Sequence, residues 1–138
     1  MKKSEKITAY FNSGMLFSEK FMLNSQEHRE DGPAVTQWSE SGVKLSELYC
    51  LYGERHRDGG PAHRVWYENG QLKYEMYFVN GKQHREKGPS YRMWDEQGNL
   101  IKEEFWLNGF DVTQSLKDKE ILNNNLNNHK KSPKIKRV

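Results

Sequence analysis

A 28-residue period runs through most of this chain and restricts the folds open to it. Three His-Arg pairs recur at this spacing, and each is followed at constant offsets by Gly-Pro, a tryptophan, a glycine, a glutamate and an aromatic residue. The repeated histidines, arginines and glutamates are His28, His56, His84, Arg29, Arg57, Arg85, Glu47, Glu75 and Glu103. A fixed period of this length indicates an array of one supersecondary unit, in which each copy buries its surface against its neighbours.

Each copy has the pattern of a β-hairpin. In the second copy, residues 62–67 read as a short strand, an Asn-Gly turn follows at 69–70, and residues 72–79 read as a longer strand. Asn-Gly favours the positive φ angles of a hairpin turn. Proline cannot donate to a ladder, so the Gly-Pro step marks the entry to the short strand. We therefore predict an all-β fold, an antiparallel meander of β-hairpin repeats in a single sheet of about eight strands.

The period also defines the domain boundaries. Residues 1–112 form the predicted repeat domain, with a partial copy at 8–27 and full copies at 28–55, 56–83 and 84–111. The pattern stops after Gly109, and residues 113–126 predict a short helix with Thr113 as its N-cap. Leu116, Ile121 and Leu122 would let this helix cap the last hairpin. Residues 127–138 contain five lysines and arginines and no acidic residue, which predicts a disordered basic tail.

The composition is typical of a thin, extended fold. Hydrophobic residues make up 34% of the chain, which is low for a deep core, whereas aromatic residues reach 12%. The net charge of +3 comes from the tail, and the rest of the chain is slightly acidic. Cys50 is the single cysteine and lies in an apolar run, so we expect a buried, inert thiol in a reducing compartment. No long apolar run follows the N-terminus, and we expect a cytoplasmic chain without a secretory signal or integral membrane association.

Repetition favours structural roles for the repeated polar residues, because a catalytic centre occurs once in a chain. We interpret the repeated histidines as hydrogen bonders that fix loops, and the repeated arginines as partners of the repeated glutamates or of backbone carbonyls. The glutamates are interpreted as one half of a salt-bridge ladder. Successive histidines would lie about 10 Å apart on neighbouring hairpins, too far to share one metal ion. We therefore predict no enzymatic activity, no cofactor and no metal.

Function is expected where the copies differ, on the short strands. The predicted partner-binding residues are Arg64, Trp66, Tyr67, Tyr91, Arg92 and Trp94. Four of them, the two arginines and the two tryptophans, share strand parity and so lie on one face. A mixture of tryptophan and arginine is typical of binding hot spots. In the alternative interpretation, the tryptophans fill the inner face of a curved sheet and the arginines stack over them.

The repeat pattern resembles a known family. His-Arg-x-x-Gly-Pro-Ala, a short strand that ends in Trp, then x-x-x-Gly and Glu-x-Tyr-x-x-Asn-Gly together resemble the variant MORN-type repeats over about residues 8–112. Such repeats are found in antitoxin-like bacterial proteins and in phage and large-virus proteins. The resemblance implies a curved ribbon of hairpins that is used for binding.

These features predict a non-catalytic protein-binding module. The resemblance suggests a phage-encoded inhibitor that blocks a host defence protein, or an antitoxin-like protein that neutralises a toxin partner. A second hypothesis is nucleic-acid binding through the Trp/Arg face and the basic tail. A third is attachment to an anionic membrane surface through the tail. Open sheet edges would also allow a homodimer.

Overall fold

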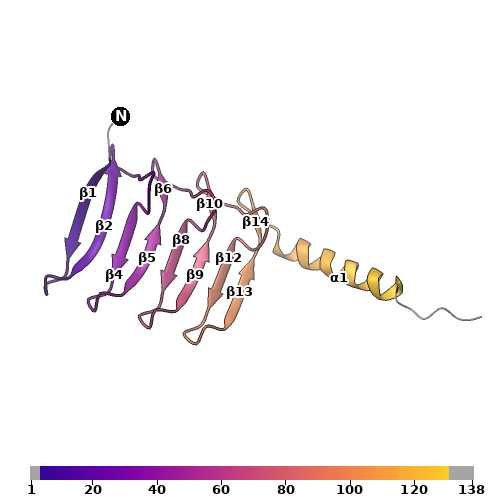
Figure 1. Cartoon of the computed structure of the whole chain (residues 1–138). Coiled ribbons are helices and arrows are strands. Elements are labelled where there is room, and N and C mark those ends of the chain that lie inside the picture. Colours follow the sequence, from indigo (N-terminus) through magenta and orange to yellow (C-terminus); the bar gives the residue numbers. More distant parts are fainter. Residues whose placement is uncertain (1–3, 131–138) are drawn as a thin grey trace, which may run out of the picture.

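The chain folds as an open antiparallel meander, and the computed structural model describes residues 4–130 (Figure 1). Four hairpins lie side by side in one sheet, in the strand order β1-β2-β4-β5-β8-β9-β12-β13. The strands of the four hairpins are β1 (Glu5–Tyr10) and β2 (Leu16–Leu23), β4 (Val35–Trp38) and β5 (Lys44–Leu48), β8 (His63–Trp66) and β9 (Leu72–Met76), and β12 (Tyr91–Trp94) and β13 (Leu100–Glu104). The predicted fold class is confirmed. The first hairpin is more complete than the predicted partial copy, because its first strand begins at Glu5.

The cross-strand register repeats from hairpin to hairpin. Glu47 faces Arg64, and Glu75 faces Arg64 on one side and Arg92 on the other. Each hairpin has a register shift at the same place, beside Tyr10, Trp38, Trp66 and Trp94. Because the register is constant, residues at equivalent positions form rows that cross the sheet.

The predicted long second strand is wrong in one respect, because it divides at its end. In the third hairpin, β9 stops at Met76, and β10 (Phe78–Val79) forms a small separate hairpin with β11 (Lys82–Gln83). The Tyr77 amide donates to the Ser90 carbonyl at 2.8 Å, while the Tyr77 carbonyl accepts from the His84 amide at 3.1 Å. The chain bends there and buries Phe78. The equivalent short strands are β3 (Gln26–Glu27), which pairs with β2, β6 (Cys50–Leu51) with β7 (Glu54–Arg55), and β14 (Trp106–Leu107) with β15 (Phe110–Asp111).

Few side chains in the described part of the chain are fully buried. The buried hydrophobic residues there are Ala34, Val35, Cys50, Ala62 and Phe78. Most strand residues are half-buried, since one sheet layer leaves both of its faces in contact with solvent. Stability must therefore come from side-chain pairs between neighbouring strands, each contributing about 0.2–1 kcal/mol.

Helix α1 (Thr113–Lys130) begins where predicted but does not cap the sheet. It extends beyond the predicted end at residue 126 and projects away from the last hairpin (Figure 1). Leu116, Ile121 and Leu122 remain 38%, 59% and 59% exposed. Their spacing of five and then one residue places them on different sides of a helix, so they form no stripe that could cover a hairpin. Residues 131–138 of the predicted basic tail lie outside the described residues.

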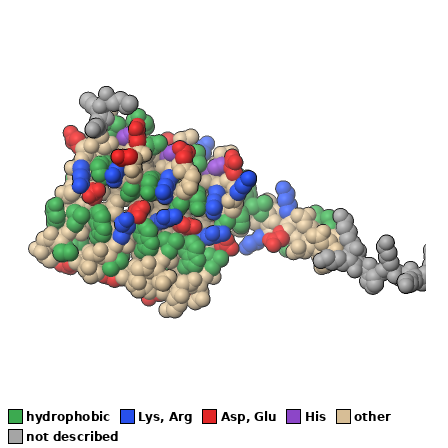
Figure 2. Space-filling view, viewed as in Figure 1, with side chains coloured by type: hydrophobic (Ala, Val, Ile, Leu, Met, Phe, Trp, Pro, Cys, Tyr) green, Lys and Arg blue, Asp and Glu red, His purple; other side chains and the backbone are tan. Residues whose placement is uncertain are grey.

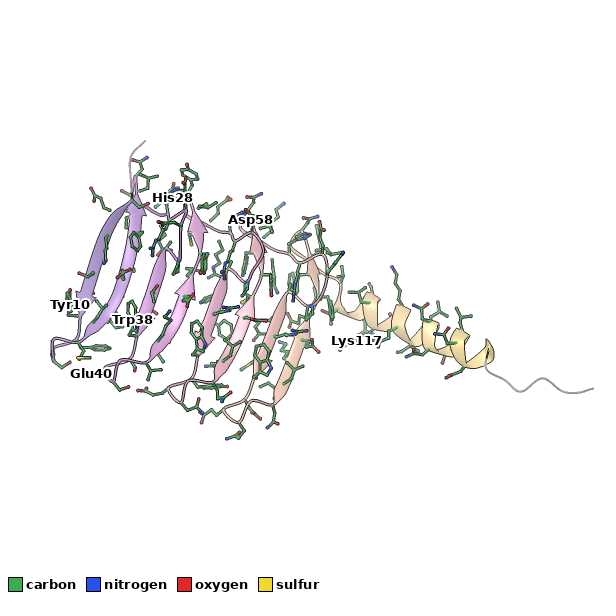
Figure 3. All side chains as sticks on the ribbon, viewed as in Figure 1. Tyr10, His28, Trp38, Glu40, Asp58 and Lys117 are labelled. Carbon is green, nitrogen blue, oxygen red and sulfur yellow. The ribbon has the colours of Figure 1, made fainter. Side chains whose placement is uncertain are left out.

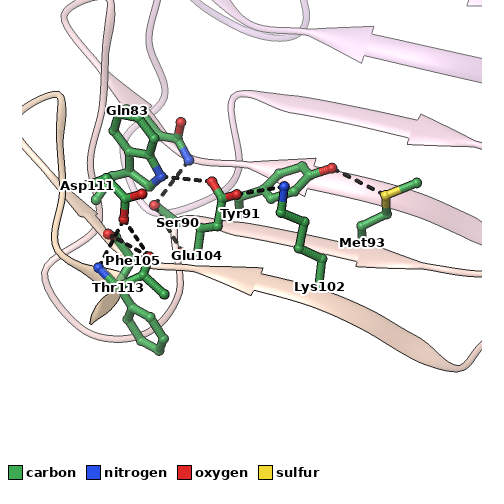
Figure 4. Close-up of polar contacts among 10 residues, drawn as sticks. Gln83, Ser90, Tyr91, Met93, Lys102, Glu104, Phe105, Asp111 and Thr113 are labelled. Carbon is green, nitrogen blue, oxygen red and sulfur yellow. Dashed lines mark hydrogen bonds and ion pairs between the residues drawn. The ribbon is translucent and has the colours of Figure 1, made fainter. Parts of the chain in front are cut away.

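The chain that enters the helix terminates the sheet. The amides of Phe21, Tyr49 and Tyr77 donate to carbonyls of the following hairpin at 2.7–2.8 Å. The equivalent amide in the last hairpin belongs to Phe105, and it donates to the Thr113 hydroxyl at 2.9 Å (Figure 4). Thr113 therefore takes the place of the next repeat at this end of β13.

Candidate binding face

One face of the sheet carries a row of alternating charges. Residues that face each other across antiparallel strands lie on the same side of the sheet. From β4 to β13 the row contains Thr36, Glu47, Arg64, Glu75, Arg92 and Glu103. We call this side the ladder face. In Figure 2, acidic and basic side chains alternate across the middle of the sheet.

Each cation of the row is paired with a carboxylate. Arg92 Nε lies 3.1 Å from Glu103 Oε2, and Arg64 Nε lies 3.7 Å from Glu75 Oε2. At the other end of the row, Lys44 and Lys6 lie 3.0 and 3.3 Å from the carboxylates of Glu47 and Glu19. The repeated glutamates thus pair with the arginines of the short strands and not with those of the His-Arg pairs. The guanidinium groups of Arg64 and Arg92 take part in the ladder instead of stacking over the tryptophans.

A second row on the ladder face is apolar. Along the first strand of each hairpin, side chains two positions apart lie on the same side, so Tyr10, Trp38, Trp66 and Trp94 share the face of the charged row. Because of the register shift, they face the second-strand residues Leu16, Lys44, Leu72 and Leu100. We call the seven apolar members the apolar stripe. Tyr10 and Trp38 mark its position near the hairpin turns in Figure 3.

The apolar stripe is open to solvent at both ends of the sheet. Tyr10 is 62% and Leu100 47% exposed, whereas the three tryptophans, Leu16 and Leu72 are half-buried between their neighbours. Sequence reasoning found the tryptophans but missed Tyr10, Leu16, Leu72 and Leu100. The three leucines lie at the same position of the 28-residue period, and Tyr10 lies at the tryptophan position.

The repeated arginines lie at the end of the sheet away from the hairpin turns. We call this end, which carries the His-Arg loops, the loop end. Arg29, Arg57 and Arg85 lie over the rings of Phe21, Tyr49 and Tyr77 at 4.0, 4.0 and 4.1 Å from the ring centroids. Each also donates from Nη1 to the carbonyl of the proline four residues later, at 3.1–3.3 Å. Of the two predicted kinds of partner, the structure shows the backbone carbonyls. The preceding glycine leaves room for the guanidinium, since a Cβ on Gly60 would lie 3.0 Å from Arg57 Cζ.

The repeated histidines connect each loop to a neighbouring turn. The Nδ1 atoms of His28, His56 and His84 accept the amides of Tyr52, Asn80 and Asn108 at 2.9–3.0 Å. An Nδ1 that accepts a backbone amide leaves the ring proton on Nε2. In the three loops Nε2 lies 3.2–4.0 Å from the carboxylate of Glu30, Asp58 or Glu86. The three histidines therefore perform the same structural task in successive repeats.

The structure divides the six predicted partner-binding residues. Arg64, Trp66, Arg92 and Trp94 lie together on the ladder face. Tyr91 faces Met76 and Glu104, so it lies on the other face of the sheet. Tyr67 connects two hairpins, because its hydroxyl donates to the Trp94 carbonyl at 2.9 Å.

Two titratable side chains away from the ladder face are held neutral. Burial lowers the pKa of His63 to about 4, with the positive charge of Arg55 acting in the same direction. Burial, together with the nearby Glu27 carboxylate, raises the pKa of the Cys50 thiol to about 11. A thiol with this pKa is almost entirely protonated at neutral pH, and it is a poor nucleophile.

A hollow of about 590 Å³ lies between two successive loops of the sheet. Arg57, Arg85 and Lys87 line it together with Asp58 and Glu86. Charges of both signs are therefore present, and the guanidinium groups of Arg57 and Arg85 already bond to proline carbonyls. Among residues 4–130, no group of three or more His, Cys, Asp or Glu side chains is placed to hold a metal ion. The helix in the same part of the chain is not long and apolar enough to cross a membrane.

Comparisons of the chain with protein-family models, with curated proteins and with solved structures return no match. The resemblance to MORN-type repeats therefore rests on the repeat residues alone and stays a prediction.

Proposed function

We propose that the chain is a non-catalytic protein-binding module that uses the ladder face. The observation that carries this proposal is the apolar stripe, a row of large side chains that crosses the sheet, is interrupted at Lys44 and is open to solvent at both ends. Contiguous exposed apolar patches on soluble domains mark sites of interaction. Tryptophan and tyrosine, which make up four of its seven members, are the residues enriched at binding hot spots.

The dimensions of the stripe suit a peptide segment that lies across the strands. It crosses eight neighbouring strands, or roughly 34 Å at about 4.8 Å per strand. A helix of about 20 residues has a similar length. The charged row beside it presents both signs in alternation, which favours an amphipathic partner with charges next to its apolar side.

The ladder face is less suited to nucleic acid. Binding to a phosphate backbone needs a surplus of positive charge, whereas Arg64 and Arg92 are each paired with a glutamate here. The antitoxin-like role and the block of a host defence protein are narrower forms of our proposal. In either, a toxin or host protein would occupy the stripe.

Lysine substitution within the stripe tests this proposal. Lys44 occupies the position equivalent to Leu16 and Leu100, so the fold already accepts lysine there. We expect the double variant Leu16→Lys/Leu100→Lys to lose the specific partner in affinity purification with quantitative mass spectrometry, from cells that express the tagged chain. The matched control is Phe110→Lys, because Phe110 is 74% exposed, lies outside the stripe and is equivalent to Lys82.

The control should capture the same partner as the unsubstituted chain. Equal recovery of that partner with the double variant would show that the stripe is not the binding surface.

A further inference from the structure

The two edges of the sheet differ in how they end. At the C-terminal edge, Thr113 accepts the Phe105 amide, and the Val112 amide donates to the Phe105 carbonyl at 2.8 Å. The chain itself thus occupies the place where a further strand would begin beside β13. At the N-terminal edge, all six residues of β1 are exposed, and no described segment lies beside its outer side (Figure 1).

The register shows which backbone groups of β1 are free. The Phe21 amide donates to Ala34, so the amides of alternate β2 residues from Phe21 point toward β4. The intervening residues of β2, among them Lys20, must point toward β1. Lys20 faces Ile7, so the amide and carbonyl of Ile7 point inward. The amides and carbonyls of Lys6 and Thr8 therefore point outward, where an unpaired edge is a template for another strand.

We infer that two copies of this chain pair through β1, antiparallel and about a two-fold axis perpendicular to the sheet. In this register Lys6 faces Thr8 of the partner subunit, and Ile7 faces Ile7 of the partner subunit. No like charges stand opposite each other, and Ile7, which is 51% exposed in the single chain, becomes covered. The two ladder faces point to the same side.

The edge that Thr113 occupies limits the assembly. Head-to-tail pairing of β1 with β13 is heterologous, and it would add copy after copy as an open fibre unless the array closed into a ring. Thr113 and the chain leading into α1 take up one end of the β13 edge. Pairing of β1 with β1 is isologous and closes at two copies.

Proline substitution tests this pairing. We expect the unsubstituted chain to show twice the mass of 16.4 kDa in light scattering at high micromolar concentration. Thr8→Pro removes an outward amide at a position where an edge strand tolerates proline, and it should restore the single-chain mass while far-ultraviolet circular dichroism stays unchanged. Thr8→Ala keeps the amide and should remain a dimer. Ile7→Pro removes an amide that points toward β2. Its far-ultraviolet circular dichroism therefore shows the change expected when the first hairpin is damaged.

Two results would overturn the inference. One is a single-chain mass for the unsubstituted protein at every concentration. The other is a dimer that persists in folded Thr8→Pro, or that is lost with Ile101→Pro on β13, since either outcome places the contact elsewhere.

Discussion

The loop end and the apolar stripe use the same repeat in opposite ways. At the loop end, each histidine and arginine is engaged by a backbone group and is wholly or partly buried, so the copies are nearly identical there. The stripe presents side chains to solvent, with Tyr or Trp on the first strand of each hairpin and Leu or Lys on the second. The difference teaches that identity between copies has two origins in this sheet. At the loop end it preserves contacts with the backbone, and along the stripe the repeated tryptophans extend one surface from hairpin to hairpin.

The largest expected effect concerns a side chain behind the ladder face. His63 has a pKa of about 4 in the folded chain and about 6.5 when unfolded. The unfolded chain therefore binds more protons between these values, so stability present above pH 6.5 falls as the pH approaches 4. The loss is at most roughly 3 kcal/mol. Urea unfolding over this pH range measures it.

The repeat provides a matched control for His63. Valine occupies the equivalent position as Val35, so His63→Val should fold and should flatten the stability profile between pH 6.5 and 4. An unchanged slope in this variant would assign the pH dependence to other groups.

Removal of a loop histidine should give the next largest effect. His28 is only 4% exposed, and its ring also packs against Tyr52 at 4.2 Å between centroids. His28→Ala leaves the Tyr52 amide without its acceptor and opens a cavity, which should lower the free energy of unfolding by about 2–3 kcal/mol. The side chain of His84 is 16% exposed, and His84→Ala should cost about 1 kcal/mol. Equal losses for the two variants, measured by urea unfolding, would contradict the role given to burial.

The charged row should contribute least to stability. Arg92 and Glu103 are 37% and 38% exposed in their side chains, and exposed ion pairs are worth about 0.2–1 kcal/mol. A double-mutant cycle with Arg92→Ala and Glu103→Ala should give a coupling energy in this range, which decreases with added salt. A larger, salt-independent coupling would mean that the ladder holds the sheet together as strongly as the loop end does.

Much of this architecture could be predicted from the period, because a constant offset fixes which strand residues face each other. The position of Glu75 on its strand, opposite Arg64 on one side and Arg92 on the other, depends on that register alone. The histidine acceptors could not be assigned to partners, because these amides lie in turns at positive φ. One of the turns carries Tyr52 at 50°, a residue type that gives no turn signal. The helix was predicted with its correct start, but its packing on the last hairpin was mispredicted, because capping depends on tertiary contact, which a run of helix-favouring residues does not specify.

One experiment tests the division between the two regions most directly. Partner capture and urea unfolding are measured together for Leu16→Lys/Leu100→Lys and for His84→Ala. We predict that the stripe variant loses the partner while its free energy of unfolding changes by less than about 0.5 kcal/mol. The loop variant should lose stability and, under conditions where it is folded, keep the partner. Loss of partner by folded His84→Ala with full capture by the stripe variant would contradict our account.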